Sequence, residues 1–161
     1  MIKVVGLDPG LAGTGVGIVE GDGRDITNYS FGSISTDKND PTHLRLNTIF
    51  TGVCDLLCRE EPDLVVIEDV FSLEKYPGSG IMLGKVSGVL LVAAFRAGAR
   101  VRELSVREAK RVVTGTGSAD KHQVERSVRN ILSHPDTIRP FHAADALALA
   151  LAGFYRSKGR A

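Results

Sequence analysis

Apart from Lys3, the residues from Ile2 to Leu7 are apolar, and the run ends on the acid Asp8. A short apolar run of this kind, rich in β-branched residues and followed by proline and glycine, is typical of a buried strand. Two more apolar segments, residues 15–20 and 29–35, flank the polar turn 21–25 and predict an antiparallel meander. The chain therefore begins with three predicted antiparallel strands, the first of which carries a carboxylate at its tip.

A helix is expected after the meander. Asp40 and Pro41 fit an N-cap and a first helical position, and apolar residues recur at helical spacing up to Pro62, before which the helix must end. The rest of the chain predicts, in order, a strand at 63–70, a glycine-containing loop at 72–80, an apolar helix to about Ala97, a short strand at 101–104 and three helical segments. This order predicts a single α/β domain, residues 1–161, whose mixed five-stranded sheet (three antiparallel strands, then two parallel) carries helices on both faces.

Acidic residues fall at the ends of two of the predicted strands. Because a crossover helix joins them, the strand at 63–70 should lie parallel to the first strand and beside it. The carboxyl ends of both strands then meet at the edge where open α/β sheets bind ligands, which brings Asp8 towards Glu68 and Asp69. Alternation places Glu68 and Asp69 on opposite faces and leaves open which face Asp8 shares.

The last helical segment, residues 141–154, is almost wholly apolar but carries Asp145, with His142 three residues earlier. Taken alone, Asp145 could be a first-turn acid that complements the helix dipole, and His142 a surface or capping residue. Close carboxylates, however, repel one another unless a cation compensates, and oxygen-rich sites favour Mg²⁺ or Mn²⁺. Together with Asp8 and Glu68, these residues indicate a metal site.

Composition and cysteine content narrow the class of protein. Of the 161 residues, 43% are hydrophobic and 24% are charged, as is ordinary for a globular protein. The apolar stretch 86–95 is about half the length needed to span a membrane, and the N-terminus lacks the features of a signal peptide, so we expect a cytoplasmic protein with no membrane partner. Cys54 and Cys58 lack further soft ligands, and we expect both to be reduced core thiols.

Basic residues are unevenly distributed, although the net charge is only +1. Residues 96–129 contain nine Lys or Arg residues against four acids. Such a segment is either a solvated helix face or a surface that binds the phosphates of nucleic acid, and charge alone does not decide between them.

Four sequence blocks stand out along the chain: GLDPGLAGTG at 6–15, VIEDVF at 66–71, TGTGSADK at 114–121 and AADALAL at 143–149. Together they resemble the RuvC-type Holliday junction resolvases of bacteria, members of the ribonuclease H-like superfamily. The resemblance extends over nearly the whole chain. It implies a homodimeric endonuclease of recombination and DNA repair, which nicks two opposed strands of a four-way DNA junction with two Mg²⁺ or Mn²⁺ ions per active site.

Individual positions can be assigned by this resemblance. Asp8, Glu68 and Asp145 match the family's metal-binding acids. The resemblance further implies that Lys110 and Lys121 serve the DNA and the scissile phosphate, and that Phe71 stacks on bases at the junction. Of the two lysines, we expect Lys121 to lie near the scissile phosphate and to offset charge in the transition state.

His142 stands where many members of that family carry an acid, although some carry histidine. We expect it to join Asp145 in the metal site and to alter the metal preference. The glycines that follow Asp8 permit a tight turn and a close approach of nucleic acid.

Two matched nicks in a two-fold substrate require two active sites, so a two-fold dimer is expected. The apolar helix around 81–95 is the candidate interface, with a buried core position as the alternative. A bacterial branch-migration motor complex is the further partner that the resemblance implies.

Two other classes of function compete with the nuclease. An actin-like sugar kinase also opens on a strand ending in Asp-x-Gly, but it needs a second domain and a phosphate loop. At 115–121 this chain has Asp120 where a P-loop has its second glycine. A non-catalytic junction-binding module would be expected to lack one or more of the acids, all of which are present. The nuclease is therefore the preferred hypothesis.

Overall fold

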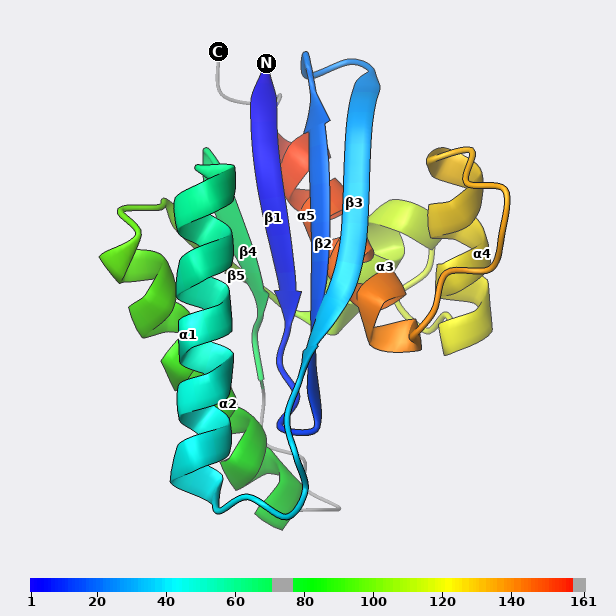
Figure 1. Ribbon diagram of the computed structural model, residues 1–161. Coiled ribbons are helices and arrows are strands. Elements are labelled where there is room, and N and C mark those ends of the chain that lie inside the picture. The colour runs from blue at the N-terminus through cyan, green and yellow to red at the C-terminus, as the bar shows by residue number, and fades with distance from the viewer. Residues whose placement is uncertain (71–76, 158–161) are drawn as a thin grey trace.

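The computed structural model describes residues 1–70 and 77–157. Strands and helices follow one another in the predicted order (Figure 1). They are β1 (Ile2–Asp8), β2 (Gly13–Gly21), β3 (Ile26–Ser35), α1 (Thr42–Glu60), β4 (Leu64–Glu68), α2 (Pro77–Arg96), β5 (Val101–Leu104), α3 (Val106–Thr114), α4 (Lys121–Ile131) and α5 (Phe141–Ser157).

The strands form one mixed sheet in the order β3-β2-β1-β4-β5. The first three strands pair antiparallel, whereas β4 runs parallel to β1 and β5 parallel to β4. β1 is therefore the central strand, and the predicted α/β fold class, with three antiparallel strands and then two parallel ones, is confirmed.

Helices cover both faces of the sheet (Figure 1). On one face, Val5 and Leu7 of β1 enter a core formed with α1 and α2. On the other, Val4 of β1 and Val66 of β4 enter a core formed with α3, α4 and α5. Alternation along each strand thus divides the apolar residues between two cores.

The start of α1 differs by one residue from the prediction. The N-cap is Pro41 in extended conformation, with no side-chain cap, so the expected N-cap role of Asp40 is wrong. The Pro41 carbonyl accepts hydrogen bonds from the backbone N–H groups of Leu44 at 3.0 Å and Arg45 at 3.1 Å. Because proline has no N–H to lose, it can serve at this boundary as well as at the next position. The predicted end before Pro62 is confirmed.

The two cysteines are free thiols, but they are not both in the core. Cys54 is half-buried and Cys58 is exposed. The buried stripe of α1 consists of Ile49, Val53 and Leu57, spaced four residues apart. Each cysteine follows a stripe residue by one position and is therefore turned about 100° away from the core, so the prediction of two core thiols is wrong for Cys58.

α5 lies directly on the backbone of β1 and β2. A Cβ atom built at Gly6 would collide with the carbonyl of Ala146, and one built at Gly17 with the backbone of Leu147. Gly6 and Gly17 are partners in the β1–β2 ladder, so they form a flat patch without side chains. This patch lets a helix of small residues pack against the sheet at close range.

The glycines after Asp8 divide between two roles. The tight turn is confirmed at Gly10, where a Cβ atom would collide with the carbonyl of Gly13. Nucleic acid cannot approach Gly15 and Gly17 as expected, because the backbone of α5 occupies the space above both.

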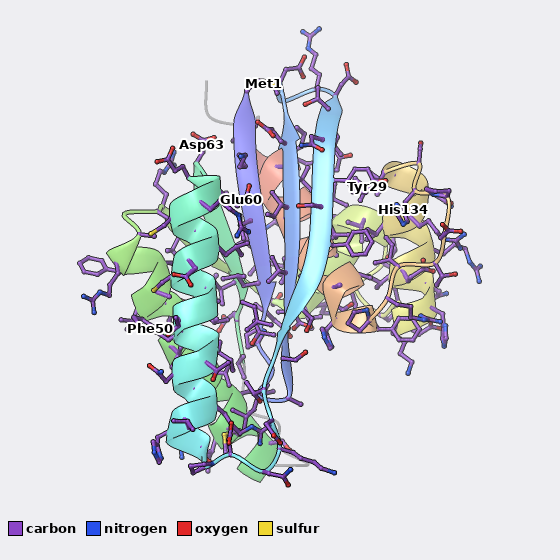
Figure 2. All side chains as sticks on the ribbon, in the orientation of Figure 1. Met1, Tyr29, Phe50, Glu60, Asp63 and His134 are labelled. Atoms are coloured by element: carbon purple, nitrogen blue, oxygen red, sulfur yellow. The ribbon has the colours of Figure 1, made fainter. Side chains whose placement is uncertain are left out.

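The segment between α4 and α5 is attached on two sides. The Tyr29 hydroxyl of β3 and Nδ1 of His134 lie 2.8 Å apart (Figure 2). The buried carboxylate of Glu125, in α4, accepts a hydrogen bond from the backbone N–H of Ile138 at 3.0 Å, and Ile138 is fully buried. These contacts hold the segment that leads into α5 against β3 and α4.

α2 has two apolar faces. Val86, Leu90 and Ala93 are fully buried, whereas Ile81 is 65% exposed and Phe95 81%. By length and composition alone, its segment Gly78–Arg96 is the one candidate membrane span among the described residues. Within this segment, 28% of the apolar 18-residue stretch is buried. One face of α2 therefore belongs to the core, and the other is left in solvent.

Candidate active site

Asp8 and Glu68 project from the same face of the sheet, the face that α5 covers. The register pairs Gly6 with Val66, which places Asp8 level with Glu68 at the carboxyl ends of β1 and β4. Because side chains along a strand alternate between its two faces, Asp8 lies on the same face as Val4, and Glu68 on the same face as Val66. Both valines belong to the core beneath α5. Asp8 therefore shares the face of Glu68 and not that of Asp69, which alternation within one strand left open.

The carboxyl groups of Asp8 and Glu68 share a hydrogen bond. Burial, the hydrogen bond and charge of Glu68, and the charge of Asp145 all raise the pKa of Asp8 well above its ordinary value of 3.8. The nearness of Glu68 thus disfavours the charged form of Asp8, and a bound cation would offset this repulsion.

Asp145 reaches the same group of acids from α5. Its burial and the charge of Glu68 raise its pKa to about 6, against a smaller lowering by Lys110. Glu68, Lys110 and Asp145 also line one small cavity, about 10 Å³ in volume, at the junction of the sheet with α3, α4 and α5. A space of this size holds about one water molecule. Of the two lysines assigned by resemblance, Lys110 is therefore the one whose charge acts on Asp145.

His142 occupies the first turn of α5, one turn before Asp145. Its Nε2 lies 2.9 Å from the Oγ of Ser33, on β3. Burial lowers the pKa of His142 below its ordinary value of 6.5, which favours the neutral imidazole that a metal ligand requires. The sequence offered no signal for Ser33, because the contact depends on the placement of α5 over β3.

Thr14 holds the turn that follows Asp8. It is fully buried, and its hydroxyl donates a hydrogen bond to the carbonyl of Gly10 at 2.9 Å. A buried hydroxyl with its partner satisfied stabilises one geometry of the turn. Thr14 of β2 thus fixes the turn that follows Asp8 at the end of β1.

The remaining candidates lie around this centre. Lys121 is the first residue of α4, and its Nζ lies 5.0 Å from the ring centroid of Phe141. Phe71, expected to stack on bases, lies outside the described residues.

The donor set fits a hard divalent cation. Asp8, Glu68 and Asp145 supply carboxylate oxygens. The pKa values of Asp8 and Asp145 are raised, so the protein compensates their negative charge only in part, through Lys110 beside Asp145. Oxygen ligands of this kind suit Mg²⁺ or Mn²⁺. Within the described residues, no group of three or more His, Cys, Asp or Glu side chains could hold an ion as it stands.

A five-stranded sheet in the order β3-β2-β1-β4-β5, with acids at the ends of β1 and β4, is the architecture of ribonuclease H-like nucleases. The chain belongs to the family of the crossover junction endodeoxyribonuclease RuvC, whose family model matches residues 4–153. The resemblance seen in the four sequence blocks is thereby confirmed.

Relatives of known name and structure agree with this assignment. The crossover junction endodeoxyribonuclease RuvC of Colwellia psychrerythraea is 40% identical over 152 residues, which are 94% of this chain and 86% of that protein. The RuvC structure from Thermus thermophilus is 34% identical and covers 98% of this chain and 97% of its own, with a TM-score of 0.81. The structure of T. thermophilus RuvC in complex with a Holliday junction substrate matches with a TM-score of 0.85 at 31% identity, over 99% of this chain and 96% of that one.

Proposed function

We propose that the protein is a structure-selective endonuclease, a single domain over residues 1–161, that resolves four-way DNA junctions by paired symmetric nicks in recombination and DNA repair. The observation that carries the proposal is the meeting of Asp8, Glu68 and Asp145 at one sheet edge in a member of the RuvC family. A solved relative in complex with a Holliday junction substrate supports the choice of substrate.

Asp8, Glu68, Asp145 and His142 are the proposed metal ligands. Asp8 lies on the central strand with Glu68 on one side and α5 above it, so it is the best placed to be shared between two ions. When bound, two Mg²⁺ or Mn²⁺ ions supply the Lewis acidity that phosphodiester hydrolysis requires. The imidazole of His142 in place of a carboxylate removes one negative charge and favours Mn²⁺ over Mg²⁺.

The reaction is hydrolysis of one phosphodiester bond in each of two strands. A water oxygen forms a bond to phosphorus, the bond from phosphorus to the 3′-oxygen breaks, and the leaving oxygen takes up a proton to give a 3′-hydroxyl and a 5′-phosphate. The Lys110 ammonium, beside Asp145, offsets negative charge as it develops on the phosphate. Lys121 binds the DNA backbone, and Phe71 stacks on bases at the junction.

A homodimer is the proposed active form, with α2 at its interface. Five exposed positions form one stripe along this helix: Ile81, Gly84, Gly88, Val92 and Phe95. Cβ atoms built at both glycines of the stripe would meet nothing within 4 Å, so the centre of the stripe is flat and open. An apolar stripe with small residues at its centre suits close packing against a second copy of the same helix.

Two further proposals rest on family membership. The protein acts in the bacterial cytoplasm on chromosomal DNA, without a membrane partner. A branch-migration motor complex brings junctions to it.

Neither competing class fits the site as well. Both the N2 and N3 amide groups of α4, at His122 and Gln123, donate hydrogen bonds of 2.9 Å to the Asp120 carboxylate. A carboxylate therefore caps the helix end that a P-loop offers to phosphate, which argues against a kinase-like phosphate loop. A non-catalytic binding module has no need for three partly buried acids placed so that Glu68 raises the pKa values of Asp8 and Asp145.

The substrate class is tested by incubating the protein with an end-labelled four-way junction, a linear duplex and a splayed duplex, each with Mg²⁺ or Mn²⁺. Paired symmetric nicks in the junction alone are expected, with a higher rate in Mn²⁺. Equal cutting of the linear duplex would contradict junction selectivity.

A further inference from the structure

Two cations rest on one aromatic ring beside the acidic site. The guanidinium carbon of Arg139 lies 4.0 Å from the ring centroid of Phe141, and Nζ of Lys121 lies 5.0 Å from the same centroid. Both distances fall within the range of cation–π attraction, which extends to about 6 Å. The ring of His122 contacts Phe141 edge-on, with centroids 5.0 Å apart.

The backbone at each cation is fixed by buried or reciprocal contacts. Arg139 follows Ile138, whose N–H is bonded to the buried Glu125. Lys121 follows Asp120, which forms a reciprocal capping box with Gln123 at the start of α4. The two side chains therefore leave the fold from fixed points, and each cation lies within 5.0 Å of the centroid of the Phe141 ring.

Both cations are available to a ligand. Lys121 and Arg139 are exposed, and within residues 1–70 and 77–157 neither forms an ion pair with an acid. A planar ring attracts them without neutralising their charge, so their N–H groups remain free to donate. Two exposed cations that the protein holds against one ring are suited to the phosphates of a nucleic-acid strand.

The position of the ring relates this pair to the acids. Phe141 immediately precedes His142 in the first turn of α5, and it is half-buried. It also precedes Asp145 by four residues, which places the two on one side of α5 and one turn apart, so Phe141 and its cations lie one turn away from Asp145. A phosphate held there would be a neighbour of the one cleaved.

We propose that Phe141 is a positioning residue, which holds Lys121 and Arg139 as a two-cation site for a backbone phosphate of the cleaved DNA strand. The inference rests on the proposed junction nuclease function and adds Arg139 and Phe141 to its DNA contacts. Two anchored contacts on one strand, one at the acids and one at this pair, determine which phosphate reaches the acids.

The first test measures metal-free binding of a fluorescent four-way junction as a function of salt concentration. Each phosphate contact contributes about 0.9 to the slope of log K against log salt for B-DNA. Arg139→Gln should reduce the slope by about this amount and weaken binding, whereas Arg24→Gln, at an exposed arginine in the turn between β2 and β3 at the other end of the sheet, should not. An unchanged slope for Arg139→Gln would overturn the site.

The second test concerns Phe141 and uses the free protein. Protons over an aromatic ring are shifted upfield, so the ε-methylene protons of Lys121 should move downfield in Phe141→Leu and stay shifted in Phe141→Tyr. A purely structural role of Phe141 would not alter these signals selectively. In junction binding, Phe141→Leu should lose several-fold in affinity and Phe141→Tyr should retain it. If Phe141→Leu changes neither the Lys121 signals nor the affinity, the positioning role is refuted.

The two proposals fail in distinguishable ways. If the wild-type protein neither prefers nor cuts four-way junctions, the proposed function fails, while the Lys121 signals still report whether Phe141 holds the lysine. If the wild type cuts junctions but Arg139→Gln behaves as wild type, only the two-cation site fails.

Discussion

Nε2 of His142 lies 2.9 Å from the Oγ of Ser33, although the two residues are 109 positions apart in the chain. A neutral imidazole has one donor and one acceptor nitrogen, so Ser33 occupies one of them and leaves Nδ1 for another partner. The edge strand β3 thereby determines which nitrogen of His142 is available to the acidic site.

Replacing Ser33 with alanine should release this ring. Residues that orient a metal-binding imidazole typically contribute about tenfold or more to activity, so we expect Ser33→Ala to slow junction cleavage by roughly tenfold while junction binding is retained. The ¹⁵N chemical shifts of the His142 ring in the metal-free protein should move towards a mixture of tautomers. Unaltered ring shifts together with an unaltered cleavage rate would show that the contact is incidental.

The stability of the metal-free protein should depend on Asp145 and on pH. The pKa of Asp145 is raised from 3.8 to about 6 in the folded protein, so the folded state favours the protonated acid. The stability that protonated Asp145 contributes is fully present below the pKa of the unfolded state, and it is lost as pH rises through the pKa of the folded state. Asp145→Asn carries no charge, so at pH 7.5 it should raise the free energy of unfolding by about 1–3 kcal/mol.

Urea unfolding in EDTA at pH 7.5 and at pH 4 checks this prediction. The gain from Asp145→Asn should be close to zero at pH 4, where Asp145 is protonated in the folded state. A loss of stability at pH 7.5 would mean that the Asp145 carboxylate stabilises the fold, contrary to its raised pKa.

The contact of α5 with the sheet should not tolerate a methyl group at Gly6. A Cβ atom there would meet backbone atoms of Ala146 and Ala150, which cannot move without displacing α5. Overpacking of this kind costs about 1–3 kcal/mol, and it shifts Asp145 away from Asp8, so Gly6→Ala should lower both stability and cleavage. Gly32→Ala is the matched control, because a Cβ atom at Gly32 in β3 meets nothing within 4 Å. Thermal unfolding of both variants measures the difference, and equal melting temperatures would refute the close packing.

The proposed dimer should depend on the exposed face of α2. Phe95 is 81% exposed, so Phe95→Asp places a charge in the interface without disturbing the core of the monomer. Sedimentation should show a dimer for the wild type and a monomer for this variant, which should then leave junctions without paired nicks. Lys38→Asp, at an exposed site in the turn before α1, should remain dimeric. A variant Phe95→Asp that is still a dimer would exclude this face as the interface.

Much of the fold could be predicted from the pattern of apolar residues. The meander and the crossover strand β4 carry apolar segments between turn residues. The short strand Val101–Leu104 was predicted to the residue, although its two central residues are charged. Element ends were less certain, because Asp40 and Pro41 both suit an N-cap and the choice depends on backbone angles. The exposure of Cys58 was missed because only some of the apolar residues of α1 belong to its buried stripe.

The acids could be predicted, but their arrangement could not. Asp8 and Glu68 end their strands, and alternation orders the residues within each strand, but only the register between β1 and β4 shows that they share a face. The contacts of His142 with Ser33 and of Phe141 with Arg139 depend on how α5 and the preceding segment lie against the sheet and α4. No periodicity in the sequence encodes such contacts.

The central claim is that the acids on the α5 face of the sheet perform metal-dependent cleavage of four-way junctions. It is tested most directly by comparing Glu68→Gln with Asp69→Asn, its neighbour in the sequence, for cleavage of a labelled junction in Mn²⁺ and for junction binding in EDTA. Because the phosphate backbone dominates affinity for DNA, Glu68→Gln should bind as the wild type does but leave the junction uncut, whereas Asp69→Asn should both bind and cut. Cleavage by Glu68→Gln at the wild-type rate, or loss of its binding together with cleavage, would contradict the claim.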